Sequence, residues 1–130
     1  MGFTEAVKTV FSKYATFSGR AMRSEYWYFV LFNFLAEVCI LLVCMIAGAL
    51  FGGLEGAAGG YAAGNIVLWI YYLAVLVPGL AVSVRRLHDT GRSGWNLLWC
   101  LLPIIGAIML LVWFVTDSKE DNQYGPRPQE

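Results

Sequence analysis

Three long apolar runs alternate with short polar connections along the chain. The runs cover residues 27–51, 66–83 and 95–115. A helix needs about 20 residues to cross a hydrocarbon core of about 30 Å, and each run approaches or exceeds that length. The helices of a soluble bundle alternate polar and apolar faces, whereas these runs do not. The pattern therefore predicts an all-α integral membrane protein with three transmembrane helices in one domain, residues 1–130.

Aromatic residues and a low charge content support the membrane interpretation. Only 14% of the 130 residues are charged, against about 25% in a typical soluble domain. Tryptophan and tyrosine concentrate at headgroup level in membrane proteins, and here they mark the ends of the runs. These residues are Tyr26, Trp27, Tyr28, Trp69, Trp95 and Trp113.

The first residues of the chain have a different pattern. Within residues 3–15, apolar side chains recur at helical spacing and the charged side chains lie between them. This spacing predicts an amphipathic helix that lies in the membrane interface beside the first span. Packing of its apolar face against the protein's own bundle is the alternative.

The distribution of lysine and arginine predicts the topology. Four precede the first run, none lies in 52–65, three lie in 84–94, and two accompany four acids in the tail, 116–130. Positively charged loops stay in the cytoplasm. We therefore expect the N-terminus and the second connection inside, and the first connection and the tail outside.

Glycine and proline leave two segments open to alternatives. The connection 52–65 continues a series of glycines spaced four apart, which begins at Gly48. It is expected to form a flexible external loop, or else a helical extension packed through its glycines. In the third run, Pro103 and Gly106 predict either a kinked full span or a re-entrant hairpin that returns the tail to the cytoplasm.

Charged residues gather just before the first run and between the second and third runs, and they form a predicted cytoplasmic cap. Its members are Arg20, Arg23, Glu25, Arg85, Arg86, Asp89 and Arg92. Guanidinium groups at this depth suit lipid phosphates, but they can equally form internal ion pairs. We expect Asp89 to pair with Arg20 or Arg23, and Glu25 to pair with Arg85 or Arg86. Arg85 and Asp89 also have the i,i+4 spacing of a helical pair.

The stretch between the last two runs is expected to form a helix–turn–helix corner. Gly91 can end the preceding helix in the left-handed conformation, and Ser93 can cap the next helix. Trp95 is expected to anchor the entry into the membrane. A structural role is expected for His88, because no second histidine or partner base is evident nearby.

A polar group inside the first run is a second candidate site. Glu37 lies ten residues beyond Trp27, about 15 Å into the membrane at 1.5 Å per residue. An ionisable group near the midplane is costly and indicates function. Asn33 shares its helical face, and Tyr71 or Tyr72 could approach from the second run. The alternative is a protonated glutamate that serves as a hydrogen-bonding strut between helices.

The composition argues against several classes of chemistry. The chain has three cysteines and one histidine, too few ligands for a zinc or iron site. We therefore expect no metal and no cofactor. The net charge is zero, which gives no electrostatic argument for nucleic acid. No nucleophile with a partner base is evident, so an enzyme is not expected.

Four motifs resemble the bacterial domain-of-unknown-function 805 family of small inner-membrane proteins. They are FSGRAMRSEYW (17–27), VRRLHDTGRSGW (84–95), LLPIIG (101–106) and NQYGPRP (122–128). The resemblance implies a multi-pass protein of the bacterial inner membrane but no established activity. The sequence therefore predicts a non-enzymatic interaction or scaffold module whose basic cap engages anionic lipid headgroups or a partner protein. The alternative is an oligomeric small transporter or channel that uses Glu37.

Overall fold

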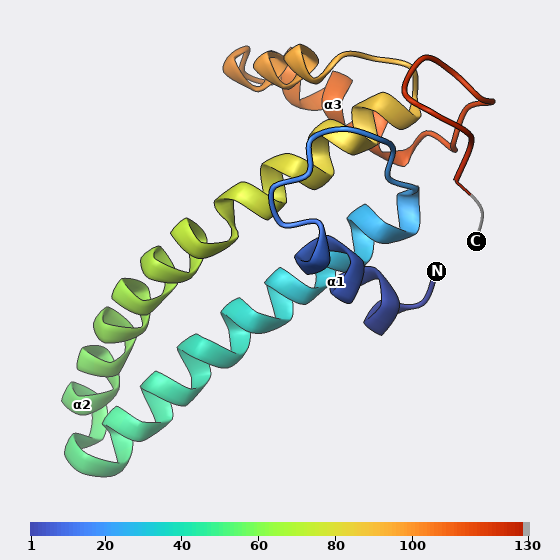
Figure 1. Cartoon of the computed structure of the whole chain (residues 1–130). Coiled ribbons are helices and arrows are strands. Elements are labelled where there is room, and N and C mark those ends of the chain that lie inside the picture. Colours follow the sequence, from blue (N-terminus) through green and yellow to red (C-terminus); the bar gives the residue numbers. More distant parts are fainter. Residues whose placement is uncertain (129–130) are drawn as a thin grey trace. The chain divides into compact units, whose positions relative to one another are not determined.

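The computed structural model describes residues 1–128, and most of these are helical (Figure 1). The elements are α1 (Phe3–Ser12), α2 (Arg23–Asp89), the 3₁₀ helix η1 (Gly94–Leu101) and α3 (Ile105–Val115). The chain divides into two compact units. Unit 1 contains Met1–Phe29 and Val77–Glu130, and unit 2 contains Val30–Leu76.

The predicted amphipathic helix is present as α1, although it ends at Ser12 rather than at residue 15. Ala6 and Val10 on its apolar face are fully buried. Phe11 makes an edge-to-face contact with Phe29 at a centroid distance of 5.7 Å. The structure thus favours the alternative in which α1 packs against its own chain, because the apolar stripe finds partners on the first turns of α2.

Helix α2 contains one reversal, at Gly53, where φ is 62° and ψ is −141°. The flexible loop expected over 52–65 is therefore wrong, since the chain is helical again directly after this single glycine. Within unit 2 a side chain on Gly48 would collide with the carbonyl oxygen of Gly56, and the reverse also holds. A side chain on Gly60 would likewise meet the carbonyl oxygen of Cys44. Glycines spaced four apart let two helix backbones approach closely, and this packing overrides the low helix propensity of glycine.

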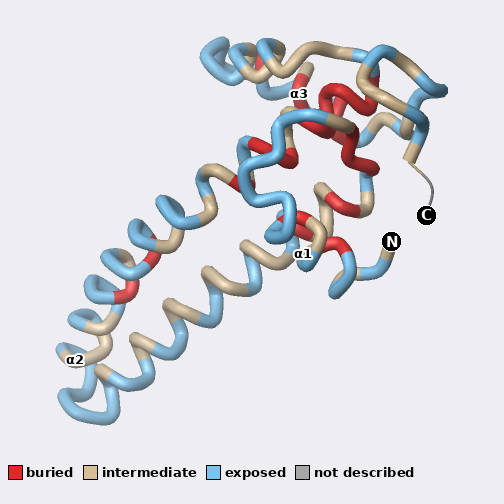
Figure 2. Tube along the Cα trace, viewed as in Figure 1, coloured by how far each residue is buried: buried red, intermediate tan, exposed pale blue. Residues whose placement is uncertain are grey.

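The outer surface of unit 2 is apolar and exposed (Figure 2). Helix α2 is long and apolar enough to cross a membrane, with a mean hydropathy of 2.6 over 18 residues. Only 6% of that stretch is buried inside the protein. An apolar surface of this kind is stable against lipid and not against water.

The third predicted span, 95–115, is not one helix. It is divided into η1 and α3, which pack against each other. Pro103 lies in the break, followed by Ile104 with a positive φ of 66°. Gly106 lies directly against the carbonyl of Trp99, where no side chain would fit. The 11 residues of α3 extend about 16 Å, about half of a hydrocarbon core, so neither half can span alone.

Unit 1 has its apolar core where α3 meets the end of α2. Leu87, Leu110, Trp113 and Phe114 are buried there, with Tyr26, Trp27, Leu97, Trp99 and Met109 packed around them. The indole of Trp27 also donates a hydrogen bond to the carbonyl of Phe114 at 2.9 Å. These contacts place the end of α3 beside the start of α2, and the tail therefore begins next to Arg23.

Candidate functional site: a buried arginine and carboxylate network

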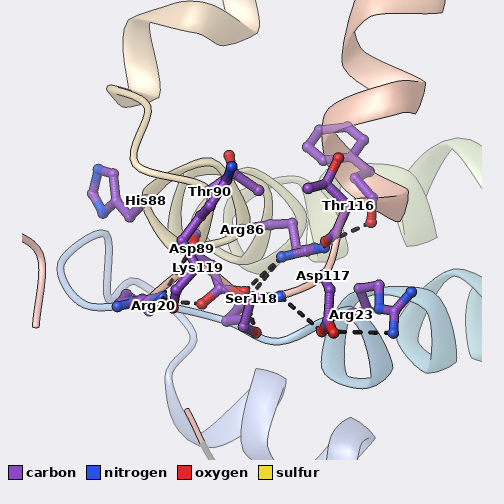
Figure 3. A network of polar contacts seen from close by, with 12 residues as sticks. Arg20, Arg23, Arg86, His88, Asp89, Thr90, Thr116, Asp117, Ser118 and Lys119 are labelled. Carbon is purple, nitrogen blue, oxygen red and sulfur yellow. Dashed lines mark hydrogen bonds and ion pairs between the residues drawn. The ribbon is translucent and has the colours of Figure 1, made fainter. Parts of the chain in front are cut away.

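Asp89, the last residue of α2, is the centre of a buried polar network (Figure 3). Its Oδ1 accepts from Arg20 Nε at 3.0 Å, and its Oδ2 accepts from Arg86 Nη1 at 2.7 Å. Ser118 Oγ adds a third bond to Oδ2 at 2.6 Å. The Asp89 side chain is fully buried, so two guanidinium groups and a hydroxyl replace the water that a carboxylate requires.

Arg20 connects this carboxylate to the C-terminal tail. Besides the bond to Oδ1, its guanidinium donates to the backbone carbonyl of Asp89 and to three tail carbonyls. The tail acceptors belong to Lys119, Glu120 and Gly125. The planar guanidinium carries five donors in a fixed fork, and here it binds the tail through backbone atoms.

Arg86 satisfies the carbonyl groups at the end of α3. It donates to the backbone oxygens of Phe114, at 3.1 Å, and Thr116. The last carbonyls of a helix have no partner within the helix and carry partial negative charge. Burial lowers the pKa of Arg86, and the charge of Asp89 opposes that effect. The residue stays ionised because a guanidinium pKa is far above neutral pH.

A second buried pair joins Glu25, in the first turn of α2, to Arg85 near its end. Arg85 also donates from Nε to the carbonyl of Thr16 at 3.1 Å, while its backbone oxygen accepts from Ala21. Its Nη2 is buried without a hydrogen-bond partner. The segment before α2 is thus fixed to the end of α2 at several points.

The two pairings expected for Asp89 and Glu25 are therefore present, with Arg20 and Arg85 as the partners. The expected i,i+4 pair of Arg85 and Asp89 is wrong. Asp89 instead takes Arg86, three residues before it, because Arg85 points to Glu25. Arg20, Arg85 and Arg86 are at most 8% exposed. These three arginines form internal ion pairs, and their burial prevents contact with a lipid in this structure.

The remaining cap residues are more exposed. Arg23 pairs loosely with Asp117 at 3.6 Å rather than with Asp89, because its side chain is 52% exposed and turned to the tail. Arg92 lies over the ring of Trp113, with its guanidinium carbon 4.6 Å from the ring centroid, a cation–π contact. These two arginines remain accessible at the surface of unit 1.

The corner after α2 forms largely as expected. Gly91 has a positive φ of 81°, and Ser93 accepts from the backbone of Trp95 at 3.3 Å. His88 donates from Nδ1 to the carbonyl of Gly19 at 2.9 Å. Its ring stacks on Tyr124 with centroids 3.9 Å apart. His88 thus has structural contacts with two other segments of unit 1.

In unit 2 the structure brings together the four residues of the intramembrane candidate site. Tyr71 donates its hydroxyl hydrogen to Asn33 Oδ1 at 2.5 Å. Tyr72 donates to Glu37 Oε1 at 2.9 Å. Each pair links one arm of the hairpin to the other, which is the geometry of a strut. Tyr72 is 40% exposed, so the Glu37 pair lies at the edge of the helix contact.

Comparison with known proteins places the whole network within one family. A family model described as "Protein of unknown function (DUF805)" matches residues 14–126. The chain belongs to the DUF805 family. It is 39% identical over 123 residues to the inner membrane protein YhaI of Escherichia coli K12, covering 93% of this chain and 92% of that protein. It is 36% identical over 121 residues to YhaH of the same strain, covering 92% and 93%. No solved structure matches the chain.

The DUF805 match includes every residue of the network and excludes all of α1. Both relatives are inner membrane proteins, and helix α2 of this chain is long and apolar enough to cross a membrane. The relatives' names give no activity.

Sequence reasoning missed the part that the tail plays in this DUF805 protein. The backbone of Lys119 donates to the carbonyl of Asp89 at 3.1 Å, and Asn122 Nδ2 donates to the carbonyl of His88 at 3.1 Å. Asn122 and Gly125 also exchange two backbone hydrogen bonds in a tight turn. A tail on the opposite side of a membrane from Arg20 could not make these contacts. The expected placement of Arg20 and the tail on opposite sides of a membrane is therefore wrong, and the NQYGP motif is the sequence signal for the tail's turn.

Proposed function

We propose that this DUF805 protein is a non-enzymatic membrane interaction module whose unit 1 engages anionic lipid headgroups. The observation that carries the proposal is the separation of charge between the two units. All nine lysines and arginines lie in unit 1, whereas Val30–Leu76 contains none. Polybasic segments beside a membrane are attracted by anionic lipids, by about 1 kcal/mol for each lysine or arginine near the surface.

The charge separation also supports a topology. The two arms of unit 2 cross the bilayer as a hairpin, so both of its ends leave the membrane on one side. Because positive segments stay inside, we place unit 1 in the cytoplasm and the Gly53 reversal outside. The η1–α3 hairpin enters the membrane from the cytoplasmic side and returns, since its halves are too short to cross.

The cations that remain accessible define the lipid-contacting set. The buried network uses Arg20, Arg85 and Arg86, which leaves Lys8, Lys13, Arg23, Arg92, Lys119 and Arg127. Of these, Lys8 and Lys13 lie on the exposed side of α1 or directly after it. They combine positive charge with an amphipathic helix, which is the usual composition of a surface-binding segment.

Lipid retention measures this proposal directly. The purified protein would be equilibrated in mixed micelles of phosphatidylglycerol and phosphatidylcholine, and retained lipids counted by native mass spectrometry at two salt concentrations. We expect phosphatidylglycerol to be enriched, and the enrichment to fall in high salt and in the Lys8→Gln/Lys13→Gln variant. Thr4→Gln, on the same helix, is the uncharged control. Equal retention of the two lipids at low salt would contradict the proposal.

A second candidate function is an oligomeric channel or transporter, and the Glu37–Tyr72 pair favours it. Placing a carboxylic acid inside an apolar hairpin costs free energy, so its presence there indicates a function. Under this hypothesis Glu37→Gln abolishes ion flux into liposomes but leaves the hairpin folded. Flux that is absent in the wild type, or unchanged in the variant, would contradict it.

A further inference from the structure

A polar cavity of about 280 Å³ lies in unit 1, beside the buried network. It is lined by Met22, Arg23, Asp117, Ser118, Arg127 and Pro128. One wall is the start of α2 and the other is the tail that follows α3. Ser118 belongs to both, since its hydroxyl donates to Asp89, whereas Arg23, Asp117 and Arg127 form only long ion pairs with one another.

The charged groups of this cavity are held loosely. Asp117 lies between the two arginines, with Oδ1 3.6 Å from Arg23 Nη2 and Oδ2 3.7 Å from Arg127 Nη2. Both separations exceed a hydrogen-bonding distance. The side chains are 52%, 66% and 41% exposed for Arg23, Asp117 and Arg127. By contrast, the guanidinium of Arg20 is buried and donates five hydrogen bonds. Each cavity arginine makes one long hydrogen bond from Nη1, Arg23 to the carbonyl of Val115 and Arg127 to Glu120 Oε1, both at 3.4 Å. The other guanidinium donors remain for a ligand.

The position of the cavity along the chain matches the level of lipid headgroups. Arg23 lies four residues before Trp27, where the first apolar run begins, and Asp117 lies two residues after Val115, where α3 ends. Both apolar segments thus stop within about one helical turn of the cavity. Tryptophan at such a boundary marks the interfacial layer that holds the phosphates.

We propose that the cavity binds a headgroup with a phosphodiester and a primary ammonium, of the phosphoethanolamine type. The phosphate contacts the guanidinium groups of Arg23 and Arg127, which suit phosphate oxygens. The ammonium contacts Asp117, whose carboxylate is released from the arginines by the phosphate. A headgroup with only negative charge would contact the same arginines but bind more weakly, because it meets the Asp117 carboxylate. The inference rests on the proposed function only in placing unit 1 at the membrane surface.

Asp117→Asn separates the two kinds of headgroup, because it removes the carboxylate and keeps the shape. Lipid selection would be measured by native mass spectrometry from nanodiscs that contain equal phosphatidylethanolamine, phosphatidylglycerol and phosphatidylcholine. We expect the wild type to retain phosphatidylethanolamine over phosphatidylcholine, since a quaternary ammonium cannot donate to Asp117. Asp117→Asn should reduce phosphatidylethanolamine retention about fivefold, which corresponds to about 1 kcal/mol for a surface charge pair. The same variant should raise phosphatidylglycerol retention.

Two further variants complete the experiment. Arg23→Gln should weaken retention of both phosphatidylethanolamine and phosphatidylglycerol, because the phosphate loses a donor. Glu120→Gln makes the same charge change as Asp117→Asn at a carboxylate that pairs with Arg127 but does not line the cavity, and it should leave the selection unchanged. Circular dichroism would verify that each variant is folded.

Unchanged or increased phosphatidylethanolamine retention in Asp117→Asn would overturn the inference. If equimolar water-soluble glycerophosphoethanolamine displaced the lipid, the ligand would be the soluble headgroup compound and not a membrane lipid. Neither result affects the proposed function, which is tested separately by the salt-dependent enrichment of phosphatidylglycerol. Conversely, phosphatidylglycerol could show no enrichment while Asp117→Asn still reduces phosphatidylethanolamine retention. That result would reject the proposed function and support the headgroup site.

Discussion

Replacing Asp89 by asparagine tests whether the buried network determines the stability of unit 1. The substitution keeps the shape of the side chain and removes the carboxylate that forms ion pairs with both Arg20 and Arg86. Both pairs are at most 2% exposed. Removing one partner of a buried pair costs about 3–5 kcal/mol, because the other charge stays buried without compensation. We expect Asp89→Asn to lower the free energy of unfolding by that amount.

Asp117→Asn is the matched control for stability. Asp117 also faces two arginines, but its side chain is 66% exposed and its ion pairs are 3.6 and 3.7 Å long. Exposed pairs contribute about 0–1 kcal/mol. Unfolding would be followed by tryptophan fluorescence in mixed micelles with increasing denaturing detergent, since Trp27 and Trp113 report on the core of unit 1.

A double-mutant cycle identifies the partner. Arg20→Gln combined with Asp89→Asn should cost clearly less than the sum of the two single substitutions, because each single variant leaves a buried charge unpaired. Contacting residues typically show interaction energies of about 0.5–3 kcal/mol. A loss below about 1 kcal/mol for Asp89→Asn, or additive losses in the cycle, would refute the reasoning.

Two other predictions follow from the backbone arrangement. Gly60→Ala should destabilise unit 2, because the added carbon meets the backbone of Cys44. Gly59→Ala adds its carbon into open space, so it should be neutral or stabilise unit 2 by about 0.5–1 kcal/mol. Thermal unfolding of the two variants checks this difference. Arg92→Cys and Lys119→Cys should react with a membrane-impermeant thiol reagent from the same side of the membrane. Glu55→Cys should react from the other side. Labelling of Lys119→Cys from the same side as Glu55→Cys would contradict the returned tail.

The apolar helix of unit 2 and the ion pairs of unit 1 could be predicted from the sequence because both follow from strong local signals. Apolar runs of sufficient length form helices in lipid, where every backbone group must be satisfied within the chain. The third run is the exception, because it is divided at Pro103. Position in the sequence narrows the partner of Asp89 to Arg20 or Arg23, and the structure identifies Arg20.

The glycine-rich segment could not be assigned from composition. Glycine lowers helix propensity by about 1 kcal/mol per residue, so 52–65 is expected to be flexible when considered alone. In the structure the same glycines let the two arms of unit 2 approach at Gly48 and Gly56. The deciding contact is between residues of different arms, and propensity contains no information about it.

The tail was misplaced for a different physical reason. Its acidic side chains indicate an external segment by the count of charges, yet Arg20 and Arg86 bind it through backbone carbonyls. Carbonyl groups occur at every residue, so no pattern of side chains marks which of them accept a hydrogen bond. The sequence signals that the chain turns back are the break at Pro103 and Ile104, which shortens α3, and the turn motif at residues 122–126.

The same backbone recognition explains why unit 1 has two kinds of arginine. Arg20, Arg85 and Arg86 lie where the chain presents carbonyls and buried carboxylates together, and most of their donors are used inside the protein. Arg23 and Arg127 lie where the tail presents an exposed carboxylate at longer distance. A buried guanidinium gains its stability from fixed partners, while an exposed one can exchange its partner at little cost. The proposed headgroup site therefore uses arginines of the second kind, whereas substitutions of the first kind are expected to act through folding.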